Sequence, residues 1–156
     1  MDASMLKGRA IVSLTEGIKV GTVAQPLFDL QLLHLVALEI TGEGGVSFIP
    51  FDQVQNIGPD VITVASQRVI AGGTSATLIE LDQVMKLKVI DQAGTFLGTI
   101  AHVDIDPASG RVVRVAAHKG GVLGVGGTTA PIDPATILSI GPDLMTLATD
   151  AALPVA

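Results

Sequence analysis

The stretch Phe96-Leu97-Gly98-Thr99-Ile100 decides the fold of this 156-residue chain, because it repeats Lys19-Val20-Gly21-Thr22-Val23 from 77 residues earlier. Both stretches place Gly and Thr between apolar residues. A second match follows at an offset of 83 residues, where Ile57-Gly58-Pro59-Asp60 returns as Ile140-Gly141-Pro142-Asp143. Two matches in the same order indicate an internal duplication. The difference between the offsets predicts a six-residue insertion in the second copy.

The two copies account for most of the chain. We place the first at residues 5–66 and the second at residues 82–148, with a linker at residues 67–81 that is rich in small residues. A unit of about 60 residues has only a marginal core of its own. We therefore expect the copies to pack against each other with pseudo-twofold symmetry, and a homodimer through a remaining apolar face is a secondary expectation.

Short apolar runs broken by turn residues fill each copy and predict β-strands. The clearest turn is Asp106-Pro107-Ala108-Ser109-Gly110, in which Pro presets one turn dihedral and Gly supplies a positive one. Such spacing predicts an all-β chain of two tandem small barrels. One short helical turn is expected in each copy, at residues 51–57 and 133–138, where an acidic residue is placed to cap it.

The second copy resembles the PRC-barrel family. The resemblance rests on Leu97-Gly98-Thr99, the Asp106–Arg111 turn, the Gly-rich stretch 120–124, Pro131 and Ile140-Gly141-Pro142-Asp143. This family is named for the cytoplasmic domain of the photosynthetic reaction-centre H subunit, and it includes the C-terminal domain of a ribosome maturation factor. The resemblance implies a small barrel that docks onto protein partners and has no family-wide catalytic residue.

The first copy follows the same pattern with one departure. Its hairpin segment, residues 29–34, keeps Asp29 but lacks the Pro and Gly of the second copy, so a different turn is expected there. Neither the membrane helix of the H subunit nor the N-terminal domain of the maturation factor is expected here, so the resemblance does not imply a photosynthetic host.

Composition argues against several classes of partner. The net charge is −6, and each half of the chain carries −3, which disfavours binding to nucleic acid or to anionic membranes. Trp and Tyr are missing, so few aromatic side chains are free to stack on bases. Without cysteine, the chain has no disulfide, thiolate nucleophile or Cys-type zinc site. No apolar stretch has the length of a signal peptide or membrane span, and we expect a cytoplasmic protein.

Two groups of residues invite a ligand-binding interpretation. Asp104 and Asp106, with Gly110, place two carboxylates close together as a divalent cation requires, but a turn role for these residues is favoured. The Gly-rich segment 120–127 allows backbone N–H groups to approach an anion, but it lacks the Lys-Ser/Thr end of a phosphate loop. We interpret it as a flexible loop.

Catalytic patterns receive little support. His34, His102 and His118 are the only histidines, and under the repeat alignment they stand opposite Arg111, Gln25 and Thr41. No spacing typical of a zinc site links them, and no serine occupies a Gly-x-Ser-x-Gly elbow.

The sequence therefore predicts a non-catalytic protein-interaction or scaffold module without cofactor or metal, whose protein partner the sequence does not identify. The alternative is a small-molecule or metal sensor that uses segment 120–127 and the Asp104/Asp106 region, and a weak hydrolase comes third. Gly21 and Gly98 are expected at bulges or close backbone approaches. The residues that we take as structural motif positions are Gly21, Thr22, Gly98, Thr99, Asp106, Gly110, Pro50, Pro131, Gly58 and Gly141.

Overall fold

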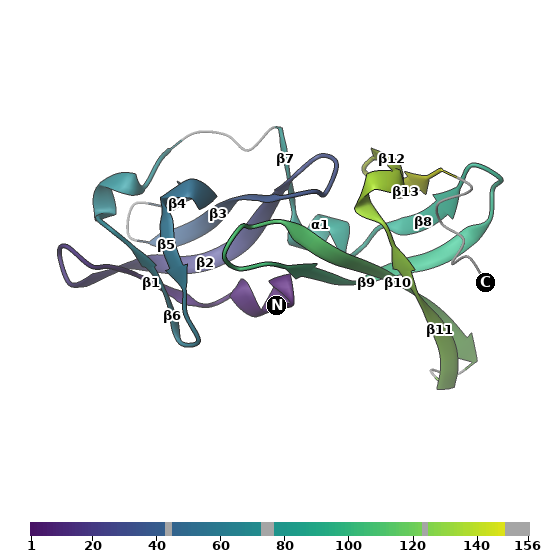
Figure 1. Ribbon diagram of the computed structural model, residues 1–156, viewed down its shortest axis with the longest axis horizontal. Coiled ribbons are helices and arrows are strands. Elements are labelled where there is room, and N and C mark those ends of the chain that lie inside the picture. Colours follow the sequence, from purple (N-terminus) through teal and green to yellow (C-terminus); the bar gives the residue numbers. More distant parts are fainter. Residues whose placement is uncertain (43–44, 73–76, 123–124, 149–156) are drawn as a thin grey trace.

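The computed structural model describes residues 1–42, 45–72, 77–122 and 125–148, which form two β-sheets of the same design (Figure 1). The first copy contains η1 (Ala3–Leu6), β1 (Ala10–Ser13), β2 (Ile18–Asp29), β3 (Leu35–Gly42), β4 (Gly45–Pro50), η2 (Phe51–Gln53), β5 (Val54–Ile57) and β6 (Val61–Val64). Between the copies lie η3 (Gln67–Val69) and β7 (Leu78–Glu80). The second copy contains α1 (Leu81–Val84), β8 (Lys88–Asp91), β9 (Phe96–Ile105), β10 (Val112–Val122), β11 (Val125–Ile132), η4 (Pro134–Thr136), β12 (Ile137–Ile140) and β13 (Leu144–Leu147). The chain is all-β, as predicted.

Both copies have one strand order. It is β4-β3-β2-β1-β6-β5 in the first sheet and β11-β10-β9-β8-β13-β12 in the second. The pairs β1–β6 and β8–β13 are parallel, and the other pairs are antiparallel. The strands at the two ends of each sheet are joined by only one short turn, η2 or η4. Each sheet must therefore curl back on itself, as a small barrel does.

The insertion lies at the end of one hairpin. In the first copy the hairpin closes after the pair Gly42–Gly45, whereas in the second it continues through Gly120–Gly127 to Val122–Val125. The prediction of a flexible Gly-rich loop is therefore wrong for the described part of segment 120–127, and residues 123–124 lie outside the described residues. Strand pairing persists because the preceding residues of β10 and β11 already fix the register. The lengthened hairpin projects from the body (Figure 1).

The two copies exchange their leading segments. β7, which leads into the second copy, pairs with β2 of the first through Leu27–Glu80 and Phe28–Ile79. Asp2, which leads into the first copy, bridges Asp104 on β9 of the second. Met1 and Ile105 complete this pair with hydrogen bonds of 3.0 and 2.8 Å between their backbones. Part of the expected linker thus belongs to a sheet.

A single hydrophobic core extends through both copies. Phe28 and Ile105 are buried at equivalent ends of β2 and β9, and Leu6 of η1 and Leu81 of α1 are buried as well. The copies therefore pack against each other, as predicted. In the described residues no helix is long and apolar enough to span a bilayer.

The two expected helical turns are present, but they are capped differently. Asp133 caps η4 by accepting a hydrogen bond from the Ala135 amide at 2.9 Å. In η2 the corresponding cap position is Pro50, and Asp52 makes no such bond. The predicted acidic cap is therefore right for η4 and wrong for η2.

Candidate functional site

The seam between the copies is built around two hairpin turns, residues 30–34 and 107–111, together with the first residues of β3 and β10. The β2–β3 and β9–β10 hairpins point in opposite directions and pass each other at the middle of the molecule (Figure 1). His34 and Arg111 form an antiparallel bridge there. These two residues are 77 positions apart, so each copy contributes the same position of the repeat.

Reciprocal backbone hydrogen bonds show the pseudo-twofold symmetry of this bridge. The Leu35 amide donates to the Gly110 carbonyl at 2.7 Å, and the Val112 amide donates to the Leu33 carbonyl at 2.8 Å. Leu35 corresponds to Val112 and Leu33 to Gly110 in the repeat. Each copy thus gives and receives the same bond, which is the pattern of an isologous interface.

Charged groups join the copies at the leading segments. Lys7 Nζ lies 2.8 Å from the Asp82 carboxylate, and Gln25 Nε2 donates to Asp82 Oδ2 at 2.6 Å. These bonds, that of Lys7 first, lower the pKa of Asp82. Burial opposes ionisation of Asp2, but hydrogen bonds from Ser4 and from His102 lower its pKa overall. His102 occupies the repeat position of Gln25, so both copies use that position to hold the exchanged segment.

Acid should weaken the contacts of Asp2 and Asp82, which hold the exchanged leading segments. Where a folded-state pKa lies below the ordinary value of 3.8, the stabilisation by that group is complete only well above pH 3.8, and it is lost as pH falls through the folded-state pKa. We expect the thermal unfolding midpoint to fall as the pH drops below about 5, and Asp82→Asn to reduce this dependence. Asp60→Asn, at an exposed position without a side-chain bond, is the matched control. Equal pH profiles for the wild type and Asp82→Asn would contradict the assignment.

The seam departs from symmetry at two pairs of equivalent positions. A Cβ added to Gly110 would lie 2.9 to 3.1 Å from ring atoms of Phe51, so the Phe51 ring of the first copy covers the turn of the second. Across the axis, Leu33 stands in place of Gly110 and Pro134 in place of Phe51. A pocket of about 270 Å³ lies there, lined by Leu33, His34, Arg111, Val112, Asp133, Pro134 and Ala135. We call it the seam pocket.

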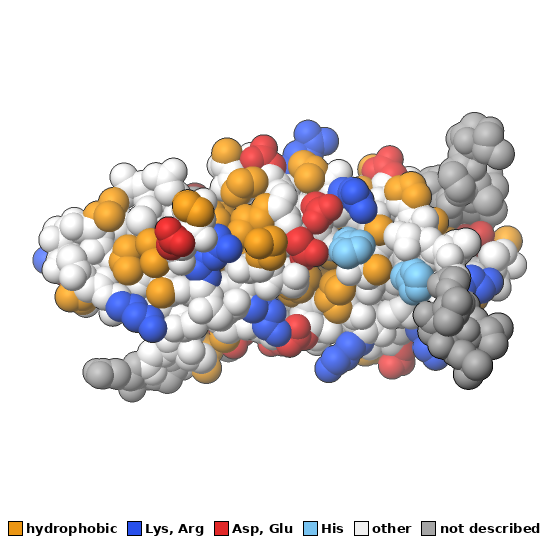
Figure 2. Space-filling model, turned by 90° about the horizontal axis from the view of Figure 1, so that it is seen from below, with side chains coloured by type: hydrophobic (Ala, Val, Ile, Leu, Met, Phe, Trp, Pro, Cys, Tyr) orange, Lys and Arg blue, Asp and Glu red, His pale blue; other side chains and the backbone are white. Residues whose placement is uncertain are grey.

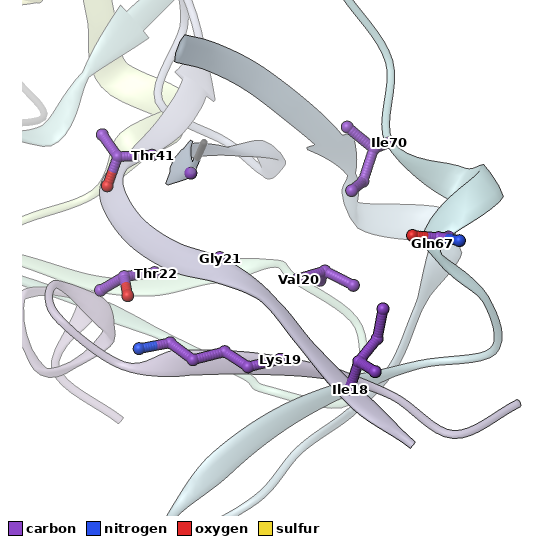
Figure 3. Close-up of a pocket in the computed structure, with 9 residues that line it drawn as sticks. Ile18, Lys19, Val20, Gly21, Thr22, Thr41, Gln67 and Ile70 are labelled. Carbon is purple, nitrogen blue, oxygen red and sulfur yellow. The ribbon is translucent and has the colours of Figure 1, made fainter. Parts of the chain in front are cut away.

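A second, larger hollow lies on the first copy (Figure 3). It has a volume of about 530 Å³ and is lined by Ile18, Lys19, Val20, Gly21, Thr22, Thr41, Gly42, Gln67 and Ile70. Figure 3 shows Ile18, Val20 and Ile70 on one side of it and the Lys19 side chain extended along the other. The hollow is open to solvent, and its polar lining groups do not converge on one point. It has the character of a shallow surface groove.

Gly21 and Gly98, singled out from the repeat, lie at equivalent close approaches. A Cβ at Gly21 would be 2.9 Å from the Thr41 carbonyl oxygen, and a Cβ at Gly98 would be 2.6 Å from that of His118. Both glycines therefore allow the second strand of each copy to approach the third. Thr22 and Thr99, which follow them, pair with the first strand and are half-buried.

The motif carboxylates and turn residues hold the backbone. Asp106 Oδ1 accepts a hydrogen bond from the Ala108 amide at 2.9 Å, and the Asp104 carboxylate lies 3.7 Å from Arg114 Nε. The Gly58 and Gly141 amides close the β5–β6 and β12–β13 turns with bonds of 3.0 and 2.9 Å. Within the described segments, no three side chains of His, Asp or Glu gather as a metal site would require.

Asp29 explains how the first copy turns without Pro and Gly. Its carboxylate accepts hydrogen bonds from the amides of Gln31, Leu33 and His34, at 2.9 to 3.0 Å. Leu32 takes a left-handed conformation, with φ of 57°, and is fully buried. The expectation of a different turn is confirmed, and burial of Leu32 offsets the strain of its backbone.

Pro50 and Pro131 do not occupy equivalent positions. Pro50 pairs with Ala37 and Pro131 with Ala116, whose counterpart in the first copy is Glu39. The repeat position of Pro131 is held by Phe48, which exchanges two backbone hydrogen bonds of 2.8 and 2.7 Å with Ala71. A proline cannot make both of these bonds, because it has no N–H.

Large apolar side chains are also exposed. They include Val36 and Val113 at equivalent positions beside the seam, and Leu138 and Leu144 on β12 and β13. Figure 2 shows one face of the molecule, on which hydrophobic side chains lie between acidic and basic ones.

A comparison with family models confirms the family resemblance of the second copy. The PRC-barrel domain model matches residues 77–153, which include β7, α1 and all of the second sheet. No curated protein matches the sequence.

Proposed function

Because residues 77–153 belong to the PRC-barrel domain family, we propose that this chain is a non-catalytic cytoplasmic module that docks onto another protein. The observation that carries the proposal is the long β10–β11 hairpin. The first copy forms the same sheet with a hairpin six residues shorter, so the added length serves no need of the barrel.

The edge of this hairpin supports a docking role. Among the described strands, β11 pairs only with β10, so one of its edges is open. In the first copy the corresponding edge is covered at Phe48 by Ala71. Pro131 lacks the N–H for that pairing and limits unwanted strand addition near the body. Beyond it, the edge from Gly127 to Thr129 can accept an extended peptide by main-chain hydrogen bonds.

The sensor alternative receives less support. Asp106 is engaged in its turn and Asp104 lies beside Arg114, so neither carboxylate is free for a cation. The described part of the Gly-rich segment is paired along β10 and β11, and a strand follows it where a phosphate-binding loop would lead into a helix.

Shortening the hairpin tests the proposal. Deleting residues 120–122 and 125–127 gives the second copy the hairpin length of the first. We expect the thermal midpoint to stay within about 3 °C, since the removed strand ends lie outside the sheet core. Capture of a stoichiometric protein partner from host extract by the tagged chain should fall at least tenfold. Undiminished capture by the shortened chain, or no partner for the intact chain, would overturn the proposal.

A further inference from the structure

The seam pocket has a counterpart in the same molecule that shows what can fill it. At the equivalent place across the pseudo-twofold axis, the Phe51 ring packs on the second-copy turn at Gly110. At the seam pocket Leu33 stands in place of Gly110 and the smaller Pro134 in place of Phe51, and a volume of about 270 Å³ remains. The fold therefore already places an aromatic ring against one of these two turns, while the other has room for a ring from outside.

The charge beside the pocket favours a carboxylate. Arg111 lines it, and within the described part of the chain its guanidinium has no hydrogen bond or ion pair. His34 also lines the pocket, with its side chain 59% exposed and Nδ1 3.7 Å from the Asp29 carboxylate. Asp133 is the acidic residue of the lining, and its Oδ1 already accepts the Ala135 amide that begins η4. An unpaired guanidinium can bind a carboxylate with two parallel hydrogen bonds.

Two exposed apolar side chains lie near the two basic residues in the chain. Val36 and Val113 follow His34 and Arg111 by two positions, at the register shifts near the start of β3 and β10. Val36 is 38% exposed and Val113 56% exposed. Arginine is enriched among the residues that contribute most to protein–protein binding energy.

We propose that the seam pocket binds an aromatic side chain of a partner protein that carries a carboxylate next to the ring, either from an acidic residue or from a chain terminus. The inference rests on the proposed docking function and assigns one point of contact to it. The ring occupies the volume that Leu33 and Pro134 line, and the carboxylate pairs with Arg111.

The test is a titration of the intact ¹⁵N-labelled chain with three small probes, followed by backbone amide chemical shifts. 3-Phenylpropanoate has both ring and carboxylate, propanoate has no ring, and 3-phenylpropylamine has the opposite charge. We expect 3-phenylpropanoate to shift the amides of Leu33, His34, Arg111 and Val112 with saturation, at least tenfold more tightly than the other two. Equal binding of all three probes, or shifts confined to other residues, would overturn the assignment.

Two arginine variants make the test specific. Arg111→Gln should weaken 3-phenylpropanoate binding about tenfold. Arg114→Gln should leave it unchanged, because Arg114 on β10 does not line the pocket and lies beside Asp104. Retained amide shifts at Leu35 and Val112 in the free Arg111→Gln variant will show that the seam is intact. Binding that survives Arg111→Gln unchanged would refute the role of Arg111.

The two proposals can fail separately. If no probe binds the pocket but the intact chain captures a partner that the shortened hairpin loses, the pocket assignment is wrong and the docking function stands. If 3-phenylpropanoate binds as expected but no protein partner is captured, the pocket is a ligand site and the docking function is wrong.

Discussion

Replacing Gly98 by alanine is expected to unfold the second copy. Gly98 has a φ of +128°, and a Cβ there would lie 2.6 Å from the His118 oxygen and 2.7 Å from the His118 carbonyl carbon. These are backbone atoms within the β9–β10 ladder, so they cannot move aside without breaking strand pairing. The strained φ costs about 1–3 kcal/mol, and overpacking costs about the same again. We expect a total loss of about 3–5 kcal/mol in the free energy of unfolding.

Two other glycines serve as controls for this prediction. Gly94 has a φ of +83° and open space around an added Cβ, so Gly94→Ala measures the conformational cost alone, about 1–2 kcal/mol. A Cβ at Gly21 would lie 2.9 Å from the Thr41 oxygen and 3.4 and 3.6 Å from Ile40 side-chain atoms, and the φ of Gly21 lies outside the left-handed region, so Gly21→Ala should fall between the two. Denaturant midpoints of the three variants give the ranking. If Gly98→Ala is no less stable than Gly94→Ala, the close approach at Gly98 does not contribute to the free energy of unfolding.

When residues 1–77 and 78–156 are expressed separately, we expect neither half to reach the stability of the intact chain on its own. The first half lacks β7 and the buried Leu81 and Val84, and the second lacks η1 with the buried Leu6. Burial of each large aliphatic side chain contributes about 1.5–3 kcal/mol. We expect each half alone to lose about 3–5 kcal/mol of stability or to self-associate. An equimolar mixture should recover the intact chain's near-native circular dichroism and a one-to-one mass.

The control for this experiment is the second half with Gly98→Ala, which should not complement the first half. Light scattering and denaturant titration report mass and stability together. If each half is monomeric and has the full stability of the intact chain, the exchanged segments contribute nothing and the copies are independent.

The repeat was the most informative part of the sequence. The Gly-Thr match identified two residues that lie at equivalent close approaches, and the two offsets revealed an insertion that the structure places at the β10–β11 hairpin. These features are predictable because each can be compared directly with the matching positions of the other copy.

The exchange of leading segments was not predictable in the same way. The apolar residues Leu78 to Leu81 predict a short strand at the boundary of the copies, but its partner, β2, lies about fifty residues away. Nothing local in the sequence shows that this strand joins the sheet of the first copy. The prediction of a loop over the Gly-rich segment was wrong because neighbouring strand pairs impose extended structure on residues with little preference for it.

The seam pocket did leave a signal in the sequence. Aligning the copies places Leu33 opposite Gly110 and Pro134 opposite Phe51, so a large residue faces a small one in each case. Such paired changes indicate that the two positions meet across an interface. Without knowledge of the pseudo-twofold axis, however, nothing in the alignment shows that Phe51 reaches the other copy.

The isologous bonds at His34 and Arg111 have a consequence for valency. Two separate single-barrel chains joined by such a seam would present every surface twice, and any partner would bind in pairs. Fusion into one polypeptide lets the halves diverge, and here one half has a ring over Gly110 while the other keeps the hollow beside Pro134. The long hairpin likewise occurs once. A chain descended from a symmetric dimer can in this way become monovalent, binding one partner molecule in one orientation.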